Sequence, residues 1–296
     1  QATSSKDKSV MIGDSPAMLI VKKLIERAAP TDANVLILGE NGTGKELVAR
    51  AIHEQSLRNQ EAFVSIDLGA VSESLFESEL FGHVKGAFTG AQQARTGRIL
   101  AANGGTLFLD EIGNLPLHLQ SKLLTVIEQR ELVPVGANKP IPFDVRLIAA
   151  TNVTLQALKN ERQFRQDLLF RLNTVEIQLP TLNQRAEDIP QLVKFFVSLY
   201  QGKYQKSDVG IPDPVIEALK IAHWAGNIRE LRHAIERAII LCDDNMLSVD
   251  NFQLVLDGHA QKPTMVADAE LTAINEGSTE PTFNLEALEN HAVTAA

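Results

Sequence analysis

The sequence predicts an α/β domain followed by a small helical domain, and two observations carry this prediction. Between residues 11 and 180, short aliphatic runs alternate with stretches whose apolar residues recur at helical spacing, a pattern typical of a parallel sheet with crossover helices. From about residue 186 to 256, the strand patterns stop and only helical patterns remain. We therefore expect an α/β domain over 11–182 and a helical domain over 183–256.

Each expected element rests on a local pattern. The β-branched and aliphatic runs that predict strands lie at 35–38, 63–66, 106–109, 145–148 and 174–177. The helical patterns lie at 46–53 and 117–128 in the first domain, and at 189–200, 214–221 and 227–241 in the second. Pro212 and Pro214 mark a helix start, and Gly226 lies in a break before the last helix.

The two ends of the chain have a different character. Residues 1–10 are polar and are interpreted as a linker, and residues 257–281 carry Gly, Pro, Thr and Glu without periodicity, which predicts a flexible linker. Residues 282–296 begin a helical pattern that the chain end interrupts. Because the sequence begins with Gln1 rather than Met, we expect it to be a fragment of a longer protein.

Composition excludes several classes of protein. A chain of 296 residues with 44% hydrophobic residues can bury a sizeable core. Its net charge of −9 has the wrong sign for a surface that binds nucleic acid by neutralising phosphates. The single cysteine, Cys242, cannot form an intrachain disulfide. No apolar run approaches the roughly 18 residues of a membrane span, so we expect a cytoplasmic protein without a membrane partner.

A glycine-rich stretch between an expected strand and an expected helix predicts a phosphate-binding loop. The stretch consists of Gly39, Glu40, Asn41, Gly42, Thr43, Gly44 and Lys45. Glycines allow backbone N–H groups to wrap phosphate oxygens, and a lysine at the helix start can reach the outer phosphates. The alternative is an ordinary glycine-rich turn. Glu46 departs from the usual pattern, since Ser or Thr normally follows the lysine and supplies a Mg²⁺ ligand.

Two acids at the end of the strand 106–109 supply the complementary chemistry. Asp110 can hold hydrated Mg²⁺, and Glu111 can orient the attacking water of a nucleotide hydrolase. Two solvated acids at a strand end are the alternative. Asn152, which follows the strand 145–148, could contact the γ-phosphate, and Arg165 and Arg171 could either serve a phosphate site or lie on a solvated helix face.

A second motif carries a resemblance to a known family. Its residues are Gly86, Ala87, Phe88, Thr89, Gly90 and Ala91. Together with the glycine-rich stretch and the paired acids, this GAFTGA sequence resembles the sigma-54-dependent activators, also called bacterial enhancer-binding proteins, over about residues 12–256. From the residues alone, a glycine-rich loop folded onto its own core is the preferred interpretation. The resemblance makes Phe88 and Thr89 the expected sigma-54 contacts.

The resemblance implies an AAA+ P-loop ATPase core with a parallel sheet and helices on both faces, followed by an all-helical lid domain. It implies ATP and Mg²⁺ as ligands and makes Glu46 an ordinary residue of the family's loop. It assigns Arg165 and Arg171 to a neighbouring subunit's ATP site, Arg229 to phosphate sensing, and Ile12 to the adenine pocket.

The resemblance also implies partners. They are sigma-54 and the RNA polymerase holoenzyme, a ring of six or seven copies of this chain, and DNA only through a Fis-type helix-turn-helix of which residues 282–296 are the truncated start. A phosphorylated receiver of a two-component system is the input domain that the family suggests.

Three positions depart from the family pattern. Asp67 stands where an asparagine usually holds the catalytic glutamate, and a second acid there could repel Glu111. Ala225 replaces a proline, and Val84 replaces a frequent glutamate at the base of the loop. We expect an ATPase that remodels sigma-54 polymerase. The alternatives are a nucleotide-binding regulatory scaffold without productive hydrolysis, which Asp67 favours, and an AAA+ unfoldase or helicase.

Overall fold

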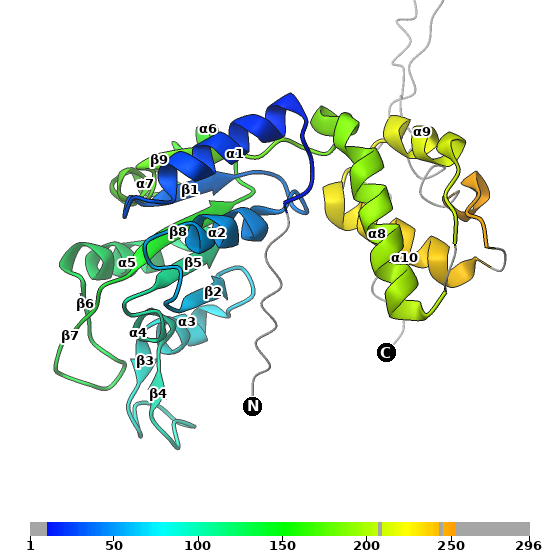
Figure 1. Ribbon diagram of the computed structural model, residues 1–296. Coiled ribbons are helices and arrows are strands. Elements are labelled where there is room, and N and C mark those ends of the chain that lie inside the picture. The colour runs from blue at the N-terminus through cyan, green and yellow to red at the C-terminus, as the bar shows by residue number, and fades with distance from the viewer. Residues whose placement is uncertain (1–10, 207–208, 243–244, 253–296) are drawn as a thin grey trace, which may run out of the picture. The chain divides into compact units, whose positions relative to one another are not determined.

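A central parallel sheet organises the first domain of the protein. The computed structural model describes residues 11–206, 209–242 and 245–252, so the expected linkers and the expected helix start at 282–296 lie outside the described residues. The sheet has five strands in the order β2-β5-β8-β1-β9, and each neighbouring pair is parallel (Figure 1). This arrangement confirms the predicted parallel α/β core.

The strands of the central sheet correspond to the five expected runs. They are β1 (Val35–Leu38), β2 (Phe63–Asp67), β5 (Thr106–Asp110), β8 (Arg146–Thr151) and β9 (Val175–Gln178). Two short antiparallel pairs were not expected from the sequence. They are β3 (Gly82–His83) with β4 (Arg95–Thr96), and β6 (Glu131–Leu132) with β7 (Ile141–Pro142).

The helices of the first domain include the two expected ones and several more. They are α1 (Pro16–Ala28), α2 (Lys45–Glu54), α3 (Glu73–Phe81), α4 (Arg98–Ala101), α5 (Leu117–Gln129), α6 (Leu155–Leu158) and α7 (Gln166–Leu172), with a 3-10 turn at Ile112–Asn114. The second domain contains α8 (Ile189–Tyr204), α9 (Asp213–Ile221) and α10 (Asn227–Leu241), flanked by 3-10 turns at Asn183–Asp188 and Val249–Phe252.

Helices cover both faces of the sheet because successive strand residues point to opposite sides. Leu36 and Leu38 of β1 pack with the α3, α4, α5 and α7 side, whereas Val35 and Ile37 pack with the α1 and α2 side. All four side chains are at most 2% exposed. A strand that is buried on both faces has no polar alternation, which explains its continuous apolar sequence.

The helical domain has a core of its own. Trp224 is fully buried there, and its indole N–H donates to the carbonyl of Leu219. Around it pack apolar residues of α8, α9 and α10, including Val193, Leu219 and Ile235. Cys242 is buried in the same cluster.

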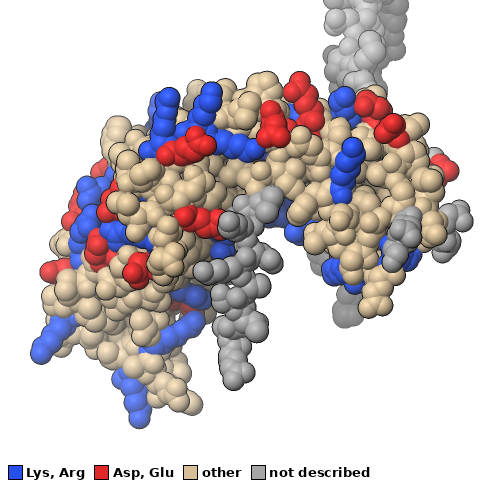
Figure 2. Space-filling view, in the orientation of Figure 1, with Lys and Arg blue, Asp and Glu red and all other residues tan. Residues whose placement is uncertain are grey.

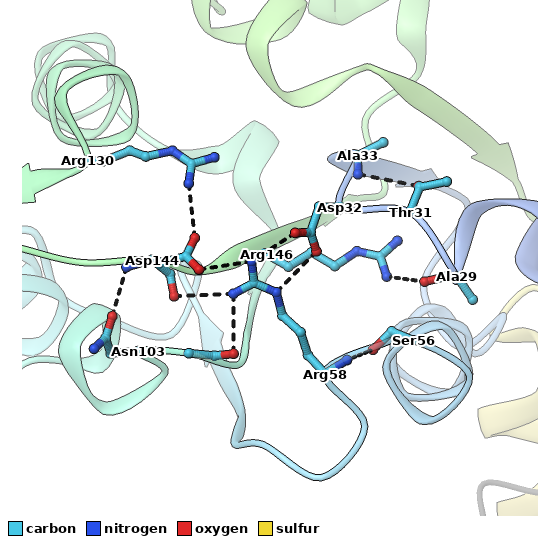
Figure 3. A network of polar contacts seen from close by, with 11 residues as sticks. Ala29, Thr31, Asp32, Ala33, Ser56, Arg58, Asn103, Arg130, Asp144 and Arg146 are labelled. Carbon is cyan, nitrogen blue, oxygen red and sulfur yellow. Dashed lines mark hydrogen bonds and ion pairs between the residues drawn. The ribbon is translucent and has the colours of Figure 1, made fainter.

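A network of charges ties together the segments that enter the sheet at its amino-terminal edge (Figure 3). Arg58 pairs with Asp32 and Asp144, both at 3.0 Å. Arg146, only 1% exposed, donates to the carbonyls of Ala28 and Ala29 at the end of α1. The hydrogen bond from Arg58 lowers the pKa of Asp32. The network stabilises the edge opposite the strand ends where Asp110 lies.

On the face shown in Figure 2, acidic and basic side chains are interspersed, and that face presents no continuous basic area among the described residues. Among the same residues, none of the helices combines the length and the apolar character that crossing a membrane requires.

Candidate nucleotide site and GAFTGA loop

The glycine-rich stretch forms the turn between β1 and α2, as the sequence predicts. Gly42 and Gly44 have φ values of +80° and +104°, which glycine adopts without the strain that a side chain would bring. Lys45 is the first residue of α2 and is 7% exposed. Its Nζ donates to the carbonyl of Gly39 at 3.1 Å and lies 3.4 Å from Oε1 of Glu111. The two predicted motifs therefore meet at Lys45.

The paired acids lie at the carboxyl end of β5. Asp110 is the last residue of the strand, and its Oδ1 accepts the N–H of Glu111 at 3.0 Å. Burial is the main cause that raises the pKa of Asp110 above its ordinary value of 3.8, and the charge of Lys45 opposes this effect. Glu111 has a φ of +55°, an uncommon conformation for a residue with a side chain. Such strain is typical of functional sites.

The raised pKa of Asp110 leads to a prediction about stability. The raised pKa means that the carboxyl group of Asp110 holds its proton more tightly in the folded protein than in the unfolded chain. The free energy of unfolding therefore falls as the pH rises above 3.8 and Asp110 ionises. Asp110→Asn removes that titration. The free energy of unfolding of the variant, relative to that of the parent protein, should therefore increase between about pH 4 and pH 7. Urea unfolding without nucleotide and Mg²⁺ measures it, and a difference independent of pH would contradict the burial effect.

A cavity of about 360 Å³ brings these residues together with the helical domain. Its walls include Gly42, Gly44, Lys45, Asp110 and Glu111 from the first domain, together with Asn41, Glu46 and Leu47. The helical domain contributes Phe196, Ile228, Arg229 and Arg232. The cavity is thus lined by three cationic side chains and by the acids Glu46, Asp110 and Glu111. Cationic groups beside the N-terminus of a helix suit a polyphosphate.

An apolar pocket adjoins the same loop. Met11, Ile12 and Met18 line it from one side, and Leu192 and Ile228 line it from the helical domain. Thr43, Gly44, Leu47, Val48, Leu179, Arg185, Phe195 and Phe196 complete the wall. Nucleotide bases bind in apolar pockets that carry a few polar groups. Ile12, which the family resemblance assigns to the adenine pocket, is one of the residues that line this pocket.

Asp67 lies beside the paired acids. Residues Asp67 and Asp110 are register partners in neighbouring strands. Oδ1 of Asp67 accepts the N–H of Gly69, and a Cβ built on Gly69 would be 3.5 Å from that of Glu111. The sequence did not indicate Asn114, whose Nδ2 donates to Oε2 of Glu111 at 3.4 Å. An amide donor to Glu111 is thus present although Asp67 replaces the asparagine that the family pattern has.

Neither pocket is lined by Asn152, Arg165 or Arg171, which were also predicted for the nucleotide site. Asn152 follows the end of β8 and is exposed. Arg165 precedes α7 and is bound to Asp167 and to Oγ of Ser121. Arg171, in the last turn of α7, lines a different and smaller cavity. Their roles in nucleotide chemistry stay predictions.

The GAFTGA residues form the turn between β3 and β4. Gly86 donates its N–H to the carbonyl of Ala91 at 2.8 Å, and Ala91 donates to the carbonyl of Phe88 at 3.0 Å. Gly86 and Gly90 have φ values of +82° and +109°, and no atom lies within 4 Å of the position of an added Cβ. The two glycines allow the chain to bend sharply on each side of the tip.

The tip of this loop is exposed and its base is fixed. Phe88 is 40% exposed, and the centroid of its ring lies 5.0 Å from that of His83. Thr89 is also exposed. At the base, Glu79 binds both Arg95 and Arg98. Val84 bonds through its backbone to Val135. Glu79 therefore supplies ionic contacts at the base of the loop, where Val84 replaces the glutamate that is frequent in the family.

Comparison with known proteins places these features in a family. The sigma-54 interaction domain family matches residues 11–178, and the AAA+ ATPase lid domain family matches residues 183–269. The chain belongs to the sigma-54 interaction domain family. The AAA+ architecture of a parallel-sheet core followed by a helical lid, expected from the sequence, is therefore confirmed.

Relatives of this sigma-54 interaction domain are transcriptional regulators. The transcriptional regulatory protein ZraR of Klebsiella oxytoca is 48% identical over 259 residues, which cover 88% of this chain and 57% of ZraR. The formate hydrogenlyase transcriptional activator FhlA of Escherichia coli is 47% identical, with 83% of this chain and 36% of FhlA covered. The chain thus spans about half, or less, of the length of these relatives.

Solved structures agree with the sequence relatives. NtrX from Brucella abortus in complex with ADP matches the sigma-54 interaction domain and lid with a TM-score of 0.77 and 36% identity, over 83% of this chain and 55% of NtrX. NtrX in complex with ATP matches with a TM-score of 0.75 and 36% identity, over 81% of this chain and 56% of NtrX. Both NtrX structures contain an adenine nucleotide.

Proposed function

We propose that this sigma-54 interaction domain hydrolyses ATP between the subunits of a ring and uses its GAFTGA loop to remodel the closed complex of sigma-54 RNA polymerase. One observation carries the proposal: Lys45, Glu111 and Asp110, together with Arg229 from the lid, face one cavity beside an apolar pocket. These are the groups needed to bind the phosphates and base of a nucleotide and to activate water.

Within this cavity the side chains have separable roles. Lys45 and the start of α2 bind the outer phosphates, because both present positive charge there. Asp110 is the residue that would hold Mg²⁺, which neutralises phosphate charge when bound. Its half-buried carboxylate at the end of β5 is the kind of oxygen ligand that a hard cation prefers. Glu111 orients and polarises the attacking water, and Asn114 supports its carboxylate through the 3.4 Å contact.

The proposal of a ring rests on charge. The γ-phosphoryl group accumulates negative charge during transfer, and an arginine from a neighbour commonly stabilises it. Arg165 and Arg171 do not line the cavity of their own chain, and the side chain of Arg165 is 41% exposed. Arg171 is exposed, and Arg165 could reach a second copy by exchanging its pair with Asp167 for a phosphate. A hexamer or heptamer would place α7 of one copy beside the cavity of the next.

The loop between β3 and β4 is the proposed contact with sigma-54. An aromatic side chain at an exposed loop tip is suited to burial against a partner, and Phe88 has that position. The polymerase holoenzyme is then the substrate of the mechanical step. DNA binding would belong to the helix-turn-helix whose expected start, 282–296, lies outside the described residues.

The second candidate is a regulatory scaffold that binds nucleotide without productive hydrolysis. It is favoured by Asp67, an acid beside Glu111 where the family pattern has an amide. Repulsion between the two carboxylates would disturb the position of Glu111. The scaffold predicts ATP binding with no turnover above that of a Lys45→Ala control.

Thr89→Ala separates the motor from the contact loop. We expect ATP turnover to stay within about twofold, because Thr89 does not line the phosphate cavity. Binding to sigma-54 in the presence of ADP–aluminium fluoride should fall at least about tenfold. Thr96→Ala, an exposed threonine in β4 at the base of the loop, is the matched control and should leave both activities unchanged. Lost turnover with intact sigma-54 binding would reject this division of roles.

A further inference from the structure

The lid contacts the phosphate-binding loop through one buried asparagine that the proposed mechanism does not use. Asn227 is the first residue of α10, is fully buried and has a φ of +53°. Its Oδ1 accepts the N–H of Leu182 at 2.7 Å. Its Nδ2 donates to the carbonyl of Asn41 at 3.1 Å and to Oε2 of Glu40 at 3.0 Å. One amide thus joins the lid, the segment entering the lid, and the loop.

A second lid side chain holds the same loop two residues further on. Arg185 is 2% exposed, and its Nη2 donates to the carbonyl of Thr43 at 2.9 Å. The two backbones also touch, because a Cβ added to Gly42 would lie 2.2 Å from the carbonyl oxygen of Gly226. The lid therefore holds two loop carbonyls, and Gly42 is required for the close approach.

The geometry of the peptide bond turns these contacts into a statement about phosphate binding. In a trans peptide, the C=O and N–H groups point in opposite directions. When the lid fixes the carbonyls of Asn41 and Thr43, the N–H groups of Gly42 and Gly44 are directed away from the lid side chains that hold them. Both glycines line the cavity of about 360 Å³.

We propose that Asn227, assisted by Arg185, is a positioning residue of the phosphate site: it holds the peptide planes of the loop from behind so that their N–H groups face the phosphates. This inference rests on the proposed nucleotide binding and adds a specific consequence. The position of the lid and the strength of phosphate binding are coupled through the backbone of the loop. This coupling is separate from the direct contact that Arg229 is proposed to make with the phosphates.

The coupling predicts that replacing Asn227 weakens the binding of phosphates and leaves the binding of the base unchanged. Asn227→Asp keeps the oxygen that accepts the N–H of Leu182, but it removes the donor to the carbonyl of Asn41 and puts a carboxylate beside Glu40. Asn183→Asp is the matched control, because Asn183 is an exposed lid asparagine whose Oδ1 accepts the N–H of Trp224 in the same turn region. The control introduces the same charge away from the loop.

The test uses the full chain and two probes that divide the nucleotide. Tripolyphosphate with Mg²⁺ probes the phosphate site, adenosine probes the apolar pocket, and each competes with a fluorescent ADP analogue. For Asn227→Asp we expect at least about a tenfold loss of affinity for tripolyphosphate, from lost hydrogen bonds and a repulsive charge. Adenosine affinity should stay within about twofold, and Asn183→Asp should leave both affinities unchanged.

A second variant controls for loss of binding that is caused by unfolding. Asn227→Gly removes the side chain but accepts the positive φ, so the backbone at the start of α10 is retained; it should show the same selective loss. Equal loss of both probes in the two variants, or no loss of tripolyphosphate binding, would overturn the positioning role. If the parent protein binds neither probe, the proposed nucleotide binding itself fails, and this inference fails with it.

Discussion

Arg165→Ala and Arg171→Ala should each lower ATP turnover about 10³-fold while leaving ATP affinity within about twofold. The physical reason is that these arginines are proposed to stabilise charge on the transferring phosphoryl group of a neighbouring subunit. They do not line the cavity of their own chain, so they should contribute little to ATP binding by an isolated subunit. Steady-state hydrolysis and equilibrium ATP binding measure the two quantities separately.

Mixing experiments distinguish a shared site from a structural defect. An Arg171→Ala subunit has an intact phosphate loop, and a Lys45→Ala subunit has intact arginines, so one interface in a mixed ring combines both and should recover some hydrolysis. Arg162→Ala, an exposed arginine that precedes the same helix, should behave as the parent protein. If no mixture recovers ATP hydrolysis, the arginines act within their own chain.

Glu111→Gln should lower turnover at least about a hundredfold and preserve ATP binding. Glutamine has nearly the same shape but is a much weaker proton acceptor, so water is no longer polarised. The ion pair to Lys45 at 3.4 Å is also lost, which should not weaken phosphate binding because the lysine charge is then less neutralised. Single-turnover hydrolysis with a parallel nucleotide-binding assay measures both effects.

The control for Glu111→Gln is the same chemical change on an exposed surface. Glu128 lies on α5 and is exposed, so Glu128→Gln should retain full turnover. Turnover of Glu111→Gln equal to that of the parent protein would exclude Glu111 as the group that activates water. Turnover lost together with nucleotide binding would instead assign Glu111 to the structure of the cavity.

The parts of the fold that could be predicted are those with strong local patterns. The central strands of a two-sided parallel sheet are continuous apolar runs, so β1 and β5 were located to within a residue. The helix α10 begins and ends at the predicted residues because Gly226 breaks the chain before it. By contrast, α1 was not predicted, although Ser15 and Pro16 form a recognisable helix start.

Two of the residues that the sequence did not indicate make contacts between distant positions of the chain. Asn227 contacts residues of the phosphate loop 186 and 187 positions away, and Arg185 reaches Thr43 across 142 positions. No local pattern marks such contacts, since they exist only when the lid packs on the core. Asn114 lies three residues from Glu111, but only the 3-10 turn between them directs its amide to the carboxylate.

Hydrolysis as a function of protein concentration tests the central claim most directly, because catalysis and assembly appear in one measurement. Steady-state ATP turnover per subunit is measured across a dilution series in which sedimentation establishes the oligomeric state. The account predicts that turnover per subunit increases as rings assemble and approaches zero for the monomer. Turnover that stays constant down to the monomer would contradict the shared site, and ATP binding without turnover at any concentration would favour the regulatory scaffold.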